Sequence, residues 1–586
     1  MAKITINGEK YNVKSGQTIL NVARANGIHI PTLCFLKDIN EIGYCRICVV
    51  EVEGEKDLLS ACDTPIRNGM VIHTDSPKVI ESRQASLILL SKKHRFNCWV
   101  CPRGDGTCDF YNLLRDYSVE SLHFDPAEGR HKEIIPGIGI YQDQSKCVLC
   151  KKCVAVCNSI VTAKVFKFRD DDGQDPIVSP TPGLPFEEAG CLFCGQCTKV
   201  CPTGTLVETD HIKRVEKALR DPKKHVVVQM APAIRAAIGE PFGYPVGTSA
   251  KEVEGKMYRA LKELGFDEVT DTNYAADLTI MEEGTEFINR LQNGGKLPLF
   301  TSCSPGWIRY IEQYRPEYLE HLSTSKSPHM MLGSILKHFY AKEDKHLDPK
   351  DVYVVSIMPC TAKKYEISRP EMENDGIRDV DAVLTTRELA RMIKKHEIDF
   401  LNLEDYHPES RFAEYTGAAS IFGATGGVME AAVRTVYEIL EGHPLENINL
   451  NEIRGVEEDI KEATLRVAGQ DINIAIVHGG KGIKKMFEIL DEGKKQYHFI
   501  EFMACPGGCV NGGGQPIVSE DFMDRLTVAE LRAKALYELD EETSLRSSHN
   551  NEAVKWMYDN WLEKPASHVA HKYLHTKYSK KKFRRE

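Results

Sequence analysis

Nineteen cysteines constrain this 586-residue chain more than any other feature of its sequence. They stand in five groups: Cys34, Cys45, Cys48 and Cys62; Cys98, Cys101 and Cys108; Cys147, Cys150, Cys153 and Cys157; Cys191, Cys194, Cys197 and Cys201; and Cys303, Cys360, Cys505 and Cys509. The N-terminus lacks the apolar stretch of a secretion signal, so we expect a reducing, cytoplasmic location in which clustered thiols bind metal rather than form disulfides. The second group is one ligand short of four, and His94, four residues before it, supplies the missing ligand.

The first group lies in a segment, residues 1–78, whose pattern predicts a β-grasp domain. Residues 4–6 and 10–13 form two strands joined by an Asn-Gly turn, and residues 18–26 form a short helix closed by Gly27. A loop then carries the first three cysteines, and the fourth follows a short strand at residues 48–52. Thiols placed in this way on strands and loops indicate a [2Fe–2S] cluster, with a zinc site as the alternative.

His94 and the second cysteine group follow a predicted helix at residues 78–93, within a small segment at residues 79–118. Three thiolates and one imidazole suit either a zinc ion or a [4Fe–4S] cluster, and spacing alone does not choose between them. The neighbouring cluster motifs favour the [4Fe–4S] cluster. Because an imidazole adds no negative charge, the reduction potential of that cluster should exceed that of an all-thiolate one.

Two C-x2-C-x2-C-x3-C runs form the third and fourth groups, in a segment at residues 138–210. This is the two-cluster bacterial ferredoxin pattern, in which the last cysteine of each run binds the other cluster. We therefore predict that one [4Fe–4S] cluster is held by Cys147, Cys150, Cys153 and Cys201, and the other by Cys191, Cys194, Cys197 and Cys157. Together with the clusters of the two outer sites, these clusters are expected to form an electron-transfer chain. Such a chain must lead to a catalytic site elsewhere in the protein.

The last four cysteines lie far apart in a large segment, residues 211–542, and three motifs surround them. The motifs read FTSCSPGW at residues 300–307, MPCTAKKYE at residues 358–366 and EFMACPGGCVNGGGQP at residues 501–516. They resemble the signature motifs of the [FeFe]-hydrogenases. The order of the cluster segments is similar to that of the long, modular members of this family, and the resemblance covers essentially the whole chain.

This resemblance implies an enzyme that interconverts H2 with protons and electrons at an H-cluster, a [4Fe–4S] cube joined by a cysteine sulfur to a di-iron unit carrying CO, cyanide and an azadithiolate bridge. By similarity, Cys360 and Cys505 hold the cube, and Cys509 bridges it to the di-iron unit. Lys363 would donate a hydrogen bond to a cyanide, and Met358 would pack against the bridging CO. The other residues implied to line the di-iron unit are Ala231, Pro232, Gly512 and Gly513.

The resemblance also implies a proton relay. Residues 281–286, MEEGTE, resemble the segment that supplies two relay glutamates, here Glu283 and Glu286, with the hydroxyl of Ser323 between them. From the residues alone, the two glutamates would be an exposed i,i+3 pair on a helix.

The first motif departs from the family at one position. Two adjacent cysteines usually precede its proline, a relay cysteine and then a cube ligand, whereas here Cys303 is followed by Ser304. An ungapped alignment would make Cys303 the relay and Ser304 an unusual alkoxide ligand. Because thiolates hold iron–sulfur cubes and no other cysteine is spare, we expect instead that Cys303 binds the cube and the Ser304 hydroxyl serves the relay.

The Ser304 variant and the full set of accessory clusters resemble the catalytic subunit of multimeric NAD(P)-linked hydrogenases, some of which are electron-bifurcating. The chain has no GxGxxG fingerprint after a strand and no flavin motif. A nicotinamide link would therefore require flavin- and NAD(P)-binding iron–sulfur subunits in a hetero-oligomer, docked near an outer cluster. Ferredoxin is the other expected acceptor, and maturation proteins would build the di-iron unit.

Other function classes stay open at this point. The first half also resembles the cluster-bearing subunit of respiratory NADH dehydrogenases, which only carries electrons. The chain could also be a stand-alone ferredoxin-dependent hydrogenase, an H2 sensor, or an iron–sulfur assembly factor without the di-iron unit. The motifs around the last four cysteines oppose the pure electron carrier, and the retained Cys509, Lys363 and Met358 oppose the assembly factor.

Charge and hydropathy argue against two further classes. With 75 Lys and Arg against 85 Asp and Glu, the net charge of −10 is wrong for general nucleic-acid binding. No run of 18 apolar residues predicts a membrane span. We expect a small-subunit-like tail at residues 543–586, with a helix at residues 551–562, surface or packing roles for His568, His571 and His575, and a solvated basic end at residues 580–585.

The predicted architecture is multidomain α/β: a β-grasp [2Fe–2S] domain, a His/Cys3 cluster domain, a two-[4Fe–4S] ferredoxin-like domain, and a large α/β H-cluster domain with the tail. Strands predicted at residues 226–229, 297–301, 352–357 and 474–477 each precede a motif or loop. This order is expected when a site lies at the carboxyl ends of strands.

Overall fold

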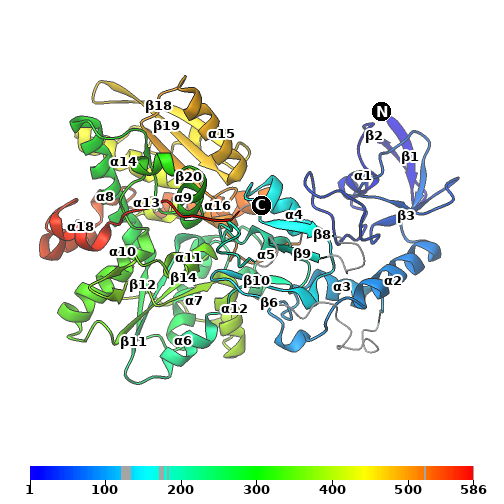
Figure 1. Cartoon of the computed structure of the whole chain (residues 1–586), viewed down its shortest axis with the longest axis horizontal. Coiled ribbons are helices and arrows are strands. Elements are labelled where there is room, and N and C mark those ends of the chain that lie inside the picture. The colour runs from blue at the N-terminus through cyan, green and yellow to red at the C-terminus, as the bar shows by residue number, and fades with distance from the viewer. Residues whose placement is uncertain (120–133, 170–176, 181–183, 520–522, 585–586) are drawn as a thin grey trace.

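The computed structural model describes residues 1–119, 134–169, 177–180, 184–519 and 523–584. Figure 1 shows the N-terminal domain (blue) at one end of the molecule, a small central region (cyan), and a large α/β region (green to yellow) at the other end. The multidomain α/β architecture predicted from the sequence is confirmed.

The N-terminal domain is a five-stranded sheet of order β2-β1-β5-β3-β4 with one helix packed on it. Asn7 and Gly8 both have positive φ, so β1 turns tightly into β2 as the Asn-Gly pair predicts. The hydroxyl of Thr18 accepts the Asn21 N–H and starts the helix. The elements are β1 (Ala2–Ile6), β2 (Glu9–Val13), α1 (Ile19–Ala25), β3 (Val49–Val52), β4 (Leu59–Ser60) and β5 (Val71–His73).

Two helices, α2 (Pro77–Ser91) and α3 (Asp109–Asp116), frame the loop that carries His94 and the second cysteine group. The buried guanidinium of Arg83 on α2 donates to the carbonyls of Ile47 and Val49, at 3.0 and 2.8 Å. These bonds attach α2 to the loop and strand beside Cys48.

The central region is built on two short sheets and two short helices. Both helices begin directly after a cysteine-bearing turn with positive φ, at Lys151 and Gly195. The hydrophobic core of this region continues into the large region, because Phe186 and Phe193 belong to the same buried cluster as Trp307 and Phe502. The elements are β6 (Ile134–Ile135), β7 (Ile140–Asp143), α4 (Lys152–Ser159), β8 (Phe166–Arg169), β9 (Ile177–Pro180), α5 (Gln196–Val200) and β10 (Leu206–Glu208).

The large region contains two four-stranded sheets, of order β12-β11-β14-β17 and β13-β20-β19-β18. All strands are parallel to their neighbours except β18. The strands are β11 (His225–Met230), β12 (Glu268–Asp271), β14 (Val352–Met358) and β17 (Ala382–Thr385) in the first sheet, and β13 (Leu299–Phe300), β18 (Ile460–Val467), β19 (Gln470–His478) and β20 (Phe499–Met503) in the second. They include the four strands predicted from the sequence.

Helices cover both sheets, and the C-terminal tail packs against the large region (Figure 1). They are α6 (Ile212–Leu219), α7 (Ala250–Glu263), α8 (Thr272–Asn293), α9 (Pro305–Tyr314), α10 (Pro328–Ile335), α11 (Ala362–Glu366), α12 (Thr386–Lys395), α13 (Gly417–Ser420), α14 (Gly427–Glu441), α15 (Gly479–Glu492), α16 (Arg525–Glu542), α17 (Glu552–Met557) and α18 (His568–Leu574). A short hairpin, β15 (Glu373–Asn374) and β16 (Ile377–Arg378), lies between α11 and β17.

The tail differs from its prediction in two ways. The helix predicted at residues 551–562 consists of α17 and a wider π-helical segment, Tyr558–Leu562. The backbone of the described part of the basic end is docked, because the Lys581 N–H donates to the Glu312 carbonyl and the Arg584 N–H to the Glu188 carbonyl, at 3.0 and 2.8 Å. The side chains of Lys580, Lys582 and Arg584 are exposed, as predicted. The run of basic residues predicted exposure to solvent and gave no sign of these two backbone hydrogen bonds.

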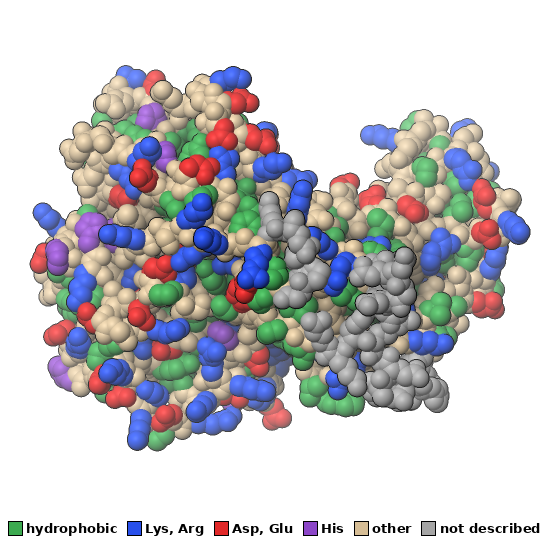
Figure 2. Space-filling view, in the orientation of Figure 1, with side chains coloured by type: hydrophobic (Ala, Val, Ile, Leu, Met, Phe, Trp, Pro, Cys, Tyr) green, Lys and Arg blue, Asp and Glu red, His purple; other side chains and the backbone are tan. Residues whose placement is uncertain are grey.

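Figure 2 shows Lys and Arg interspersed with Asp and Glu over the visible face, without a single-sign patch of the kind that tracks a nucleic-acid backbone. Within the described residues, no helix has both the length and the apolar character needed to cross a bilayer.

Candidate active site and cysteine sites

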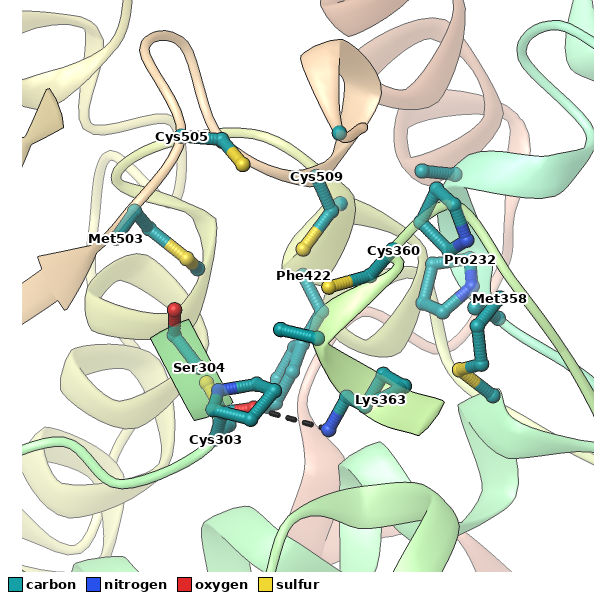
Figure 3. A pocket seen from close by; sticks show the side chains of 18 of the residues that line it. Pro232, Cys303, Ser304, Met358, Cys360, Lys363, Phe422, Met503, Cys505 and Cys509 are labelled. Carbon is teal, nitrogen blue, oxygen red and sulfur yellow. Dashed lines mark hydrogen bonds between the residues drawn. The ribbon is translucent and has the colours of Figure 1, made fainter. Parts of the chain in front are cut away.

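A cavity lies where strands from both sheets of the large region end (Figure 3). Ala231 and Pro232 follow β11, Met358 closes β14 ahead of Cys360, and Met503 closes β20 ahead of Cys505. Residues far apart in the sequence therefore meet at one point because their strands run in parallel. Among the predicted site residues, the cavity is lined by Ala231, Pro232, Cys303, Ser304, Met358, Cys360, Lys363, Cys505, Cys509 and Gly512.

Three thiols, those of Cys360, Cys505 and Cys509, face this cavity from the second and third motifs (Figure 3). Burial and, to a smaller extent, the nearby Cys505 thiol raise the pKa of Cys509 to about 12. Burial and the same neighbours also raise the pKa of Cys360. Three buried thiolates at one place are costly without a cation, so this donor set fits an iron–sulfur cube.

Gly512 and Gly513 let the backbone close tightly around the site. A Cβ atom at Gly512 would lie 2.2 Å from the Pro359 carbonyl oxygen, and one at Gly513 would lie 2.3 Å from the Cys194 carbonyl oxygen. The two glycines therefore bring the third motif against the second motif and against a cysteine of the central region, which is a more specific role than loop flexibility.

Cys303 and Ser304 point to different neighbours. After burial, the charge that most raises the pKa of the Cys303 thiol is that of Glu283, followed by Cys509. The Ser304 hydroxyl accepts the Ala504 N–H at 3.3 Å, beside Cys505, and Figure 3 shows it directed to the side of Met503 and Cys505. The expectation that Cys303 binds the cube stays untested, and this geometry favours the alternative with Ser304 at the ligand position.

Lys363 is held at the rim of the cavity by two oxygen atoms. Its ammonium lies 2.7 Å from a Glu366 carboxylate oxygen and donates to the Cys303 carbonyl at 3.1 Å. Burial alone would raise the pKa of Glu366, but Lys363 and His329 lower it to about 2. Glu366 therefore stays ionised at neutral pH and orients the lysine through this ion pair, a role that sequence reasoning did not assign although the residue belongs to the second motif.

The two predicted relay glutamates are connected by a serine. Glu283 is buried and hydrogen-bonds the Ser323 hydroxyl, which donates to Glu286 Oε2 at 3.0 Å. Burial and, to a smaller extent, the charge of Glu286 together raise the pKa of Glu283 to about 8. The interpretation as an exposed helical pair is wrong for Glu283, which is only 1% exposed.

The central region brings together the thiols of its two cysteine runs in the exchanged order. Cys201, the last cysteine of the second run, faces Cys147, Cys150 and Cys153, and raises the pKa of each beyond the effect of burial. Cys157 has the same relation to Cys191, Cys194 and Cys197. This is the arrangement that the ferredoxin pattern predicts.

The two outer sites also collect their predicted residues. The thiols of Cys34 and Cys45 hydrogen-bond each other, as do those of Cys48 and Cys62. His94 lines one cavity with Cys98, Cys101 and Cys108. Its Nδ1 lies 2.9 Å from the Lys146 carbonyl, which can only accept, so Nδ1 carries the hydrogen and Nε2 is free to bind iron.

Short contacts connect the cysteine sites to one another. The Asn40 amide donates to both the Cys34 and the Cys150 carbonyls, at 2.6 and 3.1 Å. The Arg103 guanidinium donates to the Cys201 carbonyl at 3.0 Å. The Thr361 hydroxyl, next to Cys360, donates to the Phe193 carbonyl at 2.6 Å. Both outer sites thus border the site formed by Cys147, Cys150, Cys153 and Cys201, and the run that begins at Cys191 (the Cys191 run) borders the cavity.

Among the described residues, no three His, Cys, Asp or Glu side chains close on a single metal ion. Sequence reasoning also missed several polar residues around the cavity. Lys199 and Gln196 donate to Asn511, and the Glu501 carboxylate accepts the N–H groups of Gly426 and Met429. All four residues lie within recognised motifs, but Gln196 and Lys199 occupy unspecified positions of the Cys191–Cys201 run, so the cysteine pattern carried no signal for them.

Four family descriptions match the chain. "Iron only hydrogenase large subunit, C-terminal domain" matches residues 224–513, and "Iron hydrogenase small subunit" matches residues 526–581. "2Fe-2S iron-sulfur cluster binding domain" matches residues 1–77, and "4Fe-4S dicluster domain" matches residues 127–205.

Curated relatives extend over the full chain. Iron hydrogenase 1 of Clostridium pasteurianum is 45% identical over 99% of this chain and 100% of its own length. The NADP-reducing hydrogenase subunit HndD of Solidesulfovibrio fructosivorans is 41% identical over 99% of both chains. The cytosolic Fe-S cluster assembly factor narfl of Danio rerio is 32% identical, but over only 61% of this chain and 86% of its own.

Solved structures match the large region. An apo [FeFe]-hydrogenase HydA1 from Chlamydomonas reinhardtii has 38% sequence identity and a TM-score of 0.56, and the match covers 64% of this chain and 99% of that one. A second HydA structure, whose title describes stepwise H-cluster assembly, gives the same values.

Proposed function

We propose, because the chain belongs to the iron-only ([FeFe]) hydrogenase family, that it interconverts H2 with protons and electrons at an H-cluster held in the central cavity. The observation that carries this proposal is the meeting of the Cys360, Cys505 and Cys509 thiols beside the charged Lys363. When bound, the H-cluster supplies the hydrogen chemistry, and the accessory clusters supply single-electron transfer.

The proposed cofactors are one [2Fe–2S] cluster, three accessory [4Fe–4S] clusters and the H-cluster. The proposed ligands of the accessory clusters are the four sets described above, with His94 as the single nitrogen ligand. The domain limits that we propose are residues 1–78, 79–118, 138–210, 211–542 and 543–586. In support, these ranges separate the cysteine sets, although the shared hydrophobic core joins the third and fourth domains.

We assign Cys303 to the proton relay and place the Ser304 oxygen at the fourth corner of the cube. The support is the position of the Cys303 thiol next to Glu283, and of the Ser304 hydroxyl next to Ala504. This assignment reverses the preference that thiolate chemistry alone gave. A serine at a cube corner is the unusual element of the site.

Protons travel between the surface and the cavity through four side chains. Glu286 exchanges a proton with Glu283 through the Ser323 hydroxyl, which can donate to one carboxylate while accepting from the other. Glu283, with a pKa of about 8, then exchanges it with the Cys303 thiol. A carboxyl whose pKa lies near the operating pH is suited to both directions of transfer.

We propose that flavin- and NAD(P)-binding iron–sulfur subunits associate with the chain, with ferredoxin as a second electron acceptor. The support is the full-length similarity to an NADP-reducing hydrogenase subunit, together with the lack of a dinucleotide fingerprint in this sequence. Co-purification of a flavin-containing partner from the native source is the expected result. A native monomer that exchanges electrons directly with ferredoxin would contradict the multimeric proposal. We also propose that maturation proteins build the di-iron unit and that the protein is located in the cytoplasm.

The function is tested by H2 evolution from a reduced viologen dye by the chain alone, produced without oxygen, with and without the maturation proteins that build the di-iron unit. Activity only after maturation is the expected result. A chain that acquires its cubes but never binds the di-iron unit would contradict the proposal and indicate an electron-transfer or assembly protein.

A further inference from the structure

The C-terminal tail forms a β-bridge with the loop that follows the relay serine. Ser325 pairs with His575, the Lys326 N–H donates to the Leu574 carbonyl, and the Thr576 N–H donates to the Thr324 carbonyl, both at 2.8 Å. This contact brings a histidine, predicted to have only a surface or packing role, next to Thr324, the residue directly after Ser323. His575 is buried, with 8% of its surface exposed.

His575 uses both ring nitrogens. Its Nε2 lies 2.9 Å from Glu282 Oε2, and its Nδ1 lies 2.8 Å from the Thr324 hydroxyl. The same hydroxyl lies 3.2 Å from Glu286 Oε2. A continuous line of polar contacts therefore runs from the outer relay glutamate through one hydroxyl to an imidazole.

Glu282 fixes which nitrogen of His575 carries a hydrogen. This carboxylate is fully buried and accepts the Tyr558 hydroxyl at 2.6 Å and the Ala566 N–H at 2.8 Å. As a carboxylate it can only accept, so His575 Nε2 donates to it and Nδ1 of the neutral ring is an acceptor. A buried carboxylate that orients an imidazole in this way also stabilises the imidazolium.

The Thr324 hydroxyl has one hydrogen and two acceptors within reach. When His575 is neutral, that hydrogen points to Nδ1, and Glu286 keeps only its other donors, Ser323, Arg290 and the Thr324 N–H. When His575 is protonated, its Nδ1–H donates to the Thr324 oxygen, and the hydroxyl hydrogen turns to Glu286. The two arrangements differ by one proton and one rotation of a hydroxyl.

We propose that His575 is a proton-holding side branch of the relay, coupled to Glu286 through the Thr324 hydroxyl; this inference rests on the proposed function. In the transfer, the Glu286 O–H bond breaks as its proton binds the Thr324 oxygen, and the original Thr324 hydrogen passes to His575 Nδ1. Glu286 is left as a carboxylate and His575 as an imidazolium paired with Glu282. His575 positions and loads the outer glutamate and does not touch the reacting atoms.

The groups that face His575 favour this role. Helix α8 contributes Glu282 and Glu286, with Arg290 bound to the other oxygen of Glu286 at 2.6 Å. The tail contributes Tyr558 through Glu282, and the exposed His571, whose ring lies tilted against that of His575 with centroids 4.2 Å apart. Glu282, which pairs directly with His575 Nε2, favours a positive charge on His575, while Arg290 offsets part of the charge of Glu286.

The test compares the fully matured wild-type protein with His575→Gln, Thr324→Val and Thr324→Ser. Gln keeps an N–H for Glu282 but removes the titrating nitrogen; Val removes the hydroxyl and keeps the backbone N–H to Glu286; Ser restores the hydroxyl. The measurement is the pH profile of dye-driven H2 evolution. We expect His575→Gln and Thr324→Val to shift this pH profile by about one pH unit, and Thr324→Ser to match the wild type.

The matched control is His571→Gln, which alters the exposed neighbour and should leave the profile unchanged. A second readout does not need turnover: the pH dependence of the carboxyl infrared band in the chain that carries its cubes without the di-iron unit. The wild type should show a carboxyl band whose pH dependence is lost in Thr324→Val. Profiles and bands that coincide in all variants would overturn the branch. An inactive wild type with the expected infrared titration would instead refute the proposed function alone.

If the His575→Gln variant fails to bind its iron–sulfur clusters, the Thr324→Val variant alone tests the proposal, because it leaves the His575–Glu282 pair in place.

Discussion

Glu283 illustrates how its surroundings turn an ordinary carboxyl into a proton carrier. Burial on α8 and the charge of Glu286 outweigh the hydrogen bond from the Ser302 N–H, and together they raise its pKa to about 8. The group therefore holds its proton at neutral pH and can release it to a neighbour at little cost.

Glu283→Gln should lower H2 evolution by about two to four orders of magnitude, the usual weight of a general acid–base group. Wild-type activity should fall as the pH rises through about 8, where Glu283 loses its proton. The native carboxyl has a higher pKa than its ordinary value of 4.5, so the folded state binds more protons between these values and loses stability as the pH rises from about 4.5 to about 8.

Chemical denaturation across this pH range measures that loss, which the variant should lack. Glu252→Gln, at an exposed position on α7, is the matched control and should change neither activity nor the pH dependence of stability. An active Glu283→Gln variant with the wild-type pH profile would remove Glu283 from the relay.

Cys303 and Ser304 are separated by two alanine variants. Cys303→Ala should keep its full iron content and lower H2 evolution by about two to four orders of magnitude, since only the relay is cut. Ser304→Ala should lose iron from the H-cluster cube, and Ser304→Cys, which supplies a thiolate, should retain it. Iron analysis and electron paramagnetic resonance are the measurements. Iron loss in Cys303→Ala with retention in Ser304→Ala would restore the assignment that thiolate chemistry first favoured.

Residue types and spacing predicted nearly all of the proposed ligands, because a thiol is informative wherever it stands. They could not decide between Cys303 and Ser304, since adjacent residues on an extended segment point to different sides and only the tertiary structure shows which. They also missed the contacts of His575, because its partners, Glu282 and Thr324, are far away in the sequence. No motif links either partner to the C-terminal tail.

At the scale of elements, parallel strands deliver the motifs to one place. The sequence predicted β11, β14 and β19 to within a few residues, because runs of Val and Ile between motifs are typical of buried parallel strands. It could not predict that these strands belong to two separate sheets, both of which contribute residues to the cavity, because strand order depends on packing between distant segments.

Gly513→Ala tests the close approach of the third motif to the central region. The new Cβ would lie 2.3 Å from the Cys194 carbonyl oxygen and 2.5 Å from Gly195 Cα, so backbone must move, at a cost of about 1–3 kcal/mol. Thermal unfolding should show this loss, and dye-driven turnover should slow as the Cys191 run moves away from the cavity.

Gly54→Ala is its control: Gly54 has a φ of +85° and meets no atom within 4 Å, so it should cost only about 1 kcal/mol of backbone strain and leave turnover unchanged. Equal effects of the two variants on turnover would show that the contact at Gly513 is not specific.

At the scale of the whole molecule, the N-terminal domain is attached to the central region through Asn40. Asn40→Ala removes one amide that serves two carbonyls and leaves both unsatisfied, at a cost of about 1–3 kcal/mol. Calorimetry should then show the N-terminal domain unfolding at a lower temperature, separately from the rest.

Asn26→Ala, which loses a bond to Val22 within the same domain, is the comparison and should destabilise that domain without changing its attachment. A single, unshifted transition in Asn40→Ala would show that other contacts hold the two domains together.

The order of the domains along the chain followed from the sequence, because each has its own cysteine pattern. Their mutual contacts did not follow. The shared core of Phe193, Trp307 and Phe502 joins segments that the domain limits separate, and the chain end returns to Glu188 in the central region. Contacts of this kind depend on how segments that are distant in the sequence fit together after folding, which local sequence patterns do not encode.

The contacts of Asn40 and Arg103 place both outer cysteine sites against the site formed by Cys147, Cys150, Cys153 and Cys201. Under the proposed cluster assignment, electrons that enter at either outer site share one path to the cavity, so the two entry rates are not additive. A redox partner that saturates this shared path from one outer site is then expected to slow electron exchange at the other without contacting it.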